Sequence, residues 1–100
     1  MKKNNDKAYN ELLNKLAESF EFANDLAKQA YLQYEMELHQ IITRKITDEK
    51  IIENLLDRML DFAFHADVLK QFKSLCRYYL NVNPTATAHY IQIYREMWDD

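Results

Sequence analysis

The chain of 100 residues contains no glycine and a single proline, Pro84. Tight turns between β-strands usually need glycine, because most other residues avoid the positive φ angles of those turns. Helices can instead be joined by short turns of Asn, Asp and Thr. The absence of glycine therefore predicts an all-α fold, a helical bundle without strands.

Hydrophobic residues make up 48% of the chain and aromatic residues 13%, which is typical of a folded domain and not of a disordered one. A chain of this length usually forms one domain and can bury a core without a metal ion or a disulfide. Cys76 is the only cysteine, so we expect a reducing, cytoplasmic environment. No apolar run is long enough to span a membrane. The many Asn, Lys and Ile residues are typical of an AT-rich bacterial or phage genome.

Apolar residues recur in steps of mostly four and three from Tyr9 to Ile41, which is a heptad-like stripe. No proline or glycine interrupts it, so we expect one long helix over about 6–45 after a disordered tail of residues 1–5. At 1.5 Å per residue this helix would be roughly 60 Å long, and the Asn-Asp pair at 24–25 is its weakest point. Small residues in the middle of the stripe would let another helix approach closely, namely Ala23, Ala27 and Ala30.

Three further helix starts follow the long helix. Thr47 is the predicted N-cap of a second helix. The apolar pattern slips after Ala66, which predicts a kink or a break near 65–67 with Asp67 capping the new start. Asn83 followed by Pro84 is a strong start signal for a last helix. The predicted helices after the first therefore cover about 48–65, 67–80 and 84–98, within a single domain of residues 1–100.

The stretch from Phe72 to Trp98 has the order of a helix-turn-helix, with a supporting helix, a short turn and a second helix. Gln and Arg side chains on the second helix could read purine bases, and cations on the first could contact phosphates. The nucleic-acid candidates under this interpretation are Lys70, Lys73, Arg77, His89, Gln92 and Arg95.

Charge disfavours this interpretation. Residues 81–100 contain one cation, Arg95, together with Glu96, Asp99 and Asp100, and this net negative charge is repelled by a phosphate backbone. A capped helix that closes the bundle accounts for the same residues. A helix-turn-helix DNA-binding regulator is therefore the alternative, and not the first hypothesis.

The sequence offers little support for catalysis or metal binding. Glu35 and His39 share one helix face, as do Asp61 and His65, but in an antiparallel hairpin the two pairs would lie roughly 10 Å apart. One metal ion cannot bind both pairs at that separation. Cys76 lies on the apolar stripe, where a lone cysteine usually packs as a small hydrophobe. We expect no metal, no cofactor and no enzymatic activity.

The first hypothesis is a small helical protein that acts by protein–protein interaction, as an adaptor, inhibitor or subunit, and that forms a homo-oligomer. The long first helix outruns what two shorter helices can cover, which leaves apolar surface for a protein partner. Tyr and Trp side chains are also enriched at protein interfaces. The candidate interface residues are Ala23, Ala27, Ala30, Tyr78 and Trp98.

Overall fold

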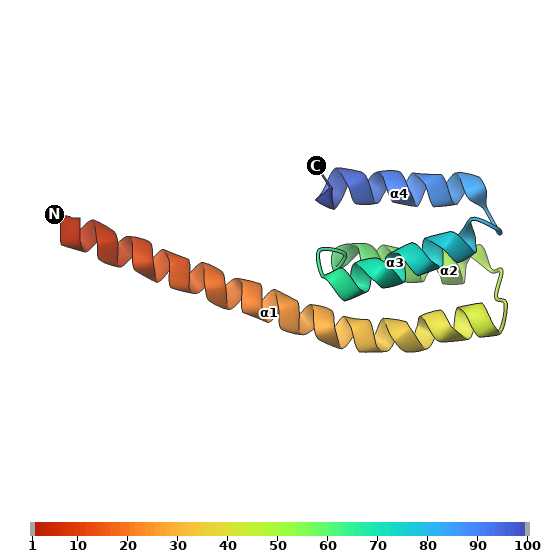
Figure 1. Ribbon diagram of the computed structural model, residues 1–100, viewed down its shortest axis with the longest axis horizontal. Helices are drawn as coiled ribbons and strands as arrows, with labels where there is room; N and C mark the ends of the chain where they lie inside the picture. Colours follow the sequence, from red (N-terminus) through yellow and green to blue (C-terminus); the bar gives the residue numbers. More distant parts are fainter. Residues whose placement is uncertain (1, 100) are drawn as a thin grey trace.

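The computed structural model describes the backbone of residues 2–99 and the side chains of residues 6–99. This part of the chain forms α1 (Lys2–Thr43), α2 (Glu49–Asp61), α3 (Ala66–Tyr79) and α4 (Pro84–Trp98), and it contains no strand. The prediction of an all-α fold is confirmed. The C-terminal half of α1 lies along α2 and α3, and α4 lies on the other side of that pair (Figure 1).

The first helix differs from its predicted bounds at both ends. It begins at Lys2 and not near residue 6, so the backbone of residues 2–5 is helical where a disordered tail was expected. Met1 lies outside the described residues. The helix continues through 24–25 without a break and ends at Thr43. Because no proline or glycine occurs in this segment, each further residue adds a hydrogen bond to a helix that has already formed.

The core lies where α1, α2 and α3 meet. Tyr34, Leu38 and Ile41 reach it from α1. α4 contributes Tyr90, whose hydroxyl donates a hydrogen bond of 2.7 Å to the Asp57 carboxylate on α2. The fully buried aliphatic and thioether side chains of this core are Ile52, Leu55, Leu56, Met59, Val68 and Leu75.

The turn between α1 and α2 has to reverse the chain without glycine. Lys45 adopts a φ of 53° there, in the left-handed region that usually favours glycine. The N–H of Ile46 donates to the carbonyl of Ile41 at 3.0 Å, and the N–H of Lys45 donates to the carbonyl of Ile42 at 3.3 Å. These two bonds form a Schellman motif, which satisfies carbonyls that the helix end leaves free.

The N-caps of the shorter helices differ partly from the prediction. Asp48, and not Thr47, caps α2, because its carboxylate accepts hydrogen bonds from the N–H groups of the first turn. The break between α2 and α3 covers residues 62–65, and His65, and not Asp67, caps α3 through its imidazole. Asn83 caps α4 directly before Pro84, as predicted. Thr47 and Asp67 are residue types that can cap a helix, but they lie one and two positions away from the actual N-caps. The residue that caps each helix is the one with an extended backbone directly before the first turn.

Candidate protein-interaction surface

The N-terminal half of α1 projects from the rest of the molecule (Figure 1). We call residues 6–26 the arm and residues 27–99 the body. On the arm, Ala23 is half-buried and every other side chain is exposed, whereas Ala27 at the start of the body is fully buried. The molecule is consequently long and thin, with principal extents of 63 × 25 × 18 Å.

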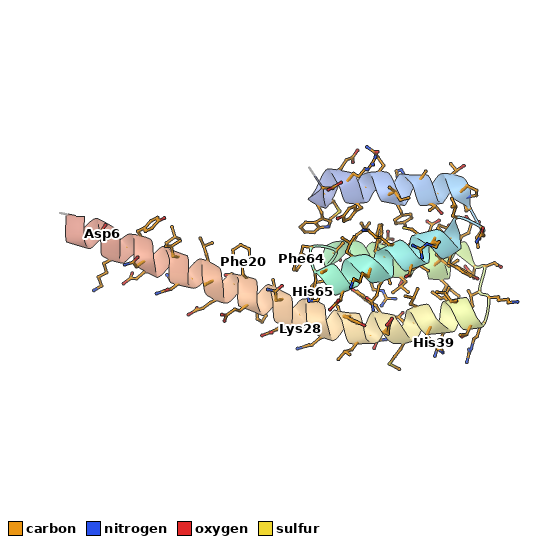
Figure 2. All side chains as sticks on the ribbon, viewed as in Figure 1. Asp6, Phe20, Lys28, His39, Phe64 and His65 are labelled. Carbon is orange, nitrogen blue, oxygen red and sulfur yellow. The ribbon has the colours of Figure 1, made fainter. Side chains whose placement is uncertain are left out.

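The arm exposes many large apolar side chains. Phe20 and Phe22 are 69% and 66% exposed, and Tyr9 is 62% exposed. Figure 2 shows Phe20 pointing to the side of α1 on which the other helices lie. We call the apolar residues on this side the arm stripe: Tyr9, Leu12, Leu13, Leu16, Phe20, Ala23 and Leu26.

The arm stripe continues the face of α1 that the body buries. Tyr9, Leu16 and Ala23 occupy the d positions of a heptad in which Leu13 and Phe20 occupy the a positions. The same register runs on to Ala27 and Tyr34, which the chain's own helices cover. One helix face is therefore a core face in its second half and a solvent-facing surface in its first half.

The flanks of the arm stripe carry no charge. Between Tyr9 and Leu26, the charged side chains all occupy the b, c and f positions, on the opposite side of the helix. The e and g positions beside the stripe are instead uncharged, which makes the apolar face wide. Two of the residues at these positions, Leu12 and Leu26, belong to the arm stripe itself, and the others are Asn10, Ala17, Ser19 and Asn24.

The structure separates the three alanines predicted as a site of close helix approach. Ala27 is 0% exposed, and Ala30 packs against the body's own core. Only Ala23 belongs to the arm, where it is half-buried. The chain itself therefore uses Ala27 and Ala30 for close packing, and of the three alanines only Ala23 lies on the arm.

The two aromatic interface candidates have partners within the chain. The Tyr78 hydroxyl donates to the carbonyl of Ile46 at 2.7 Å. The Trp98 indole N–H donates to the carbonyl of Leu60 at 2.8 Å, and its ring lies 5.5 Å from the ring of Phe64. Both side chains keep some exposed surface, but the Tyr78 hydroxyl and the Trp98 indole N–H form hydrogen bonds within the chain.

The nucleic-acid candidates do not form one surface. Lys70, Lys73 and Arg77 are exposed on α3, and His89, Gln92 and Arg95 are exposed on α4. Of these six residues, Lys73, Arg77 and Arg95 line a groove between the two helices. The helices of a helix-turn-helix cross at about 90–120°, whereas α3 and α4 run alongside each other (Figure 1).

The described residues contain no candidate metal site, no accessible thiol and no membrane-spanning helix. No group of three or more His, Cys, Asp or Glu side chains there could hold a metal ion. Cys76 is buried, which raises the pKa of its thiol to about 12. No helix in residues 2–99 is long and apolar enough to cross a membrane.

The sequence hypothesis missed two surfaces. It did not select the large arm residues such as Phe20, although the run of uncharged flanking residues was a readable signal. It also missed the apolar groove between α3 and α4, although the helix-turn-helix interpretation paired these helices and named three of the lining residues, Lys73, Arg77 and Arg95. No protein-family model, curated protein or solved structure matches this chain. Function is therefore inferred from the arm and the body themselves.

Proposed function

We propose that this protein is a small non-enzymatic helical protein that acts by protein–protein interaction, and that it self-associates through the arm. The observation that supports this is the continuation of the buried α1 face onto the exposed arm stripe. Soluble monomers rarely expose contiguous apolar patches larger than a few hundred Å². A second helix on the arm stripe would cover it as α2 and α3 cover the rest of the face.

The size of the apolar surface fits a stable interface. Tyr9 and Phe20 are each more than 60% exposed, and a fully covered aromatic side chain buries about 150–250 Å². Together with the four leucines of the arm stripe, they reach the order of the ~800 Å² per partner that a standard interface buries.

A second copy of this chain is the partner that the charge pattern favours. Identical arms bring identical charges together, and like charges beside the seam would repel. Here the flanks of the arm stripe are uncharged, so this repulsion is absent. An antiparallel arrangement that pairs a positions with d positions would place Leu13 opposite the small Ala23 and Leu16 opposite Phe20, which lets the two helices interdigitate.

Substitutions on the two faces of the arm test self-association. Leu16→Lys and Phe20→Lys place a charge on the arm stripe, where the side chains are already exposed in one chain, so the body should fold normally. Glu18→Lys is the matched control on the opposite face. Analytical ultracentrifugation should give an oligomer for the wild type and Glu18→Lys, and a monomer for the other two. A wild-type monomer at tens of micromolar would refute the proposal.

Disulfide trapping tests the antiparallel arrangement. A mixture of Leu13→Cys and Ala23→Cys chains should form mixed disulfide dimers, and neither variant alone should cross-link efficiently. Parallel arms would instead cross-link each variant with itself. Cys76 should not interfere, because it is buried and its thiol pKa is raised to about 12.

A helix-turn-helix DNA-binding regulator using residues 72–98 is the alternative, and it retains one supporting feature, the cations around the groove between α3 and α4. A duplex-binding titration at physiological salt tests it. The double variant His89→Ala, Arg95→Ala serves as the comparison. If the wild type binds the duplex tightly and the folded double variant does not bind it, the result would favour this alternative over self-association alone.

A further inference from the structure

A groove of about 390 Å³ runs between α3 and α4. Phe72, Cys76 and Tyr94 contribute to its apolar walls. Its α3 side extends from Leu69 to Leu80, which is about three helical turns or ~16 Å at 1.5 Å per residue. The groove has the volume of a binding site and the length of a short helix.

Cations lie on both sides of this groove. Lys73 and Arg77 line it one turn apart on α3, and Arg95 lines it on α4. All three side chains are exposed, and none forms an ion pair with another side chain of residues 6–99. Among residues 6–99, Asp99 is the one carboxylate that lines the groove. An occupant would therefore combine an apolar face with negative charge along its edges.

The arm of a second copy does not match this surface well. Its apolar face is suitable, but its flanking positions carry no acidic residue that could pair with Lys73 or Arg77. The phosphates of a duplex would match the cations but not the apolar walls. A fatty acid would need cations gathered at one end of the groove, whereas Arg77 lies toward the Leu80 end and Arg95 follows Tyr94, whose ring packs against Phe72 nearer the other end.

We propose that the groove binds an amphipathic helix of a partner protein whose apolar face is flanked by Asp or Glu residues. Such a helix would insert apolar residues at i, i+3 or i+4, and i+7 between α3 and α4. Leu80 and Ile91, which are 52% and 42% exposed, would become covered. Lys73 and Arg77 would pair with acids on one edge of the helix and Arg95 with acids on the other, which sets orientation and register.

A fluorescein-labelled synthetic peptide of about four helical turns, with Leu on one face and Glu at the flanking positions, tests the proposal. Fluorescence anisotropy should show that it binds the wild-type protein. Arg77→Glu should weaken binding by roughly tenfold or more, because attraction at the groove becomes repulsion. Lys70→Glu is the matched control, since Lys70 is exposed on the same helix but does not line the groove. It should change the affinity by less than about twofold, with thermal melts verifying that both variants fold.

The same titration in the Leu16→Lys variant separates this proposal from self-association. The groove is formed by the body alone, so peptide binding should be unchanged when the arm no longer pairs. Failure of self-association with intact peptide binding would refute only the proposed function. Loss of peptide binding in Leu16→Lys would refute the groove as the site.

Further results would overturn the proposal. One is a peptide with Gln in place of Glu that binds as tightly as the acidic peptide. Another is a peptide of residues 6–26 that binds the groove as tightly, which would identify a second copy as the occupant. Displacement of the acidic peptide by laurate below its micelle concentration would identify an acyl chain. Absence of acidic-peptide binding at millimolar concentration would also refute it.

Discussion

The indole N–H of Trp98 donates a hydrogen bond of 2.8 Å to the backbone carbonyl of Leu60. Leu60 lies in the last turn of α2, where carbonyl groups lack partners within the helix. The Trp98 ring also packs against Phe64 in the following loop. The C-terminal end of α4 is thereby attached to the C-terminal end of α2, through a residue that sequence patterns marked as an interface candidate.

Replacing the indole tests whether this bond stabilises the fold. Trp98→Phe keeps an aromatic ring but removes the donor, so the free energy of unfolding should fall by about 1 kcal/mol. Met97→Ala, at the neighbouring exposed position, should change it by less than about 0.5 kcal/mol. Urea unfolding followed by circular dichroism measures both values. Unchanged stability with weakened self-association would show that Trp98 acts between chains.

The turn at Lys45 should be improved by glycine. Lys45 has a φ of 53°, and a left-handed conformation costs a residue with a Cβ about 1–2 kcal/mol. Lys45→Gly removes this cost but adds freedom to the unfolded chain, so the free energy of unfolding should rise by about 0.5–1 kcal/mol. Lys50→Gly, in α2, should lower it by about 1 kcal/mol. Equal losses in both variants would contradict the role given to the turn.

The contact between Glu37 and Arg58 should make stability depend on pH. The Arg58 guanidinium donates to both carboxylate oxygens of Glu37 and lowers the pKa of that carboxyl below its usual value of 4.5. A lowered pKa in the folded state stabilises the protein above the unfolded pKa, and this contribution is lost as pH falls through the folded pKa. Because the side chains are 40% and 30% exposed, the contribution at pH 7 is about 0.5 kcal/mol.

Glu37→Gln should therefore lower the free energy of unfolding by about 0.5 kcal/mol at pH 7, and the difference from wild type should shrink on acidification below pH 4.5. Glu35→Gln changes the net charge equally but removes no contact with Arg58, so it serves as the control. Urea unfolding at a series of pH values provides the comparison. A constant difference between Glu37→Gln and wild type across that series would be inconsistent with the assigned ion pair.

We expect Ala27 to stabilise the fold of a single chain and not to form contacts between chains. Its side chain is 0% exposed, so Ala27→Glu would place a larger, charged group inside the body and should cost about 3 kcal/mol or more. Ala17→Glu is the matched change on the exposed arm and should alter thermal stability little. An Ala27→Glu protein that melts like the wild type but dissociates would restore the original interpretation of the alanine stretch.

Local interactions determined what was readable from the sequence alone. The absence of glycine and the steps of three and four specify helices, because these patterns act within a few residues. Asn83 and Pro84 specify the start of α4 for the same reason. Local patterns do not select between neighbouring candidates. Thr47 and Asp48 are both competent caps, and only the backbone path of the folded chain selects Asp48.

Packing between distant segments decided the rest. The apolar pattern of α1 is similar in both halves, so it cannot state which half is covered. α2 and α3 have 13 and 14 residues and are about 20 Å long, so they cover only the end of α1 to which the chain joins them. The groove likewise exists only because α4 packs beside α3 and is held by contacts such as Tyr90 with Asp57. The helix-turn-helix interpretation grouped Lys73, Arg77 and Arg95 with three other residues, and only that packing places these three around one groove.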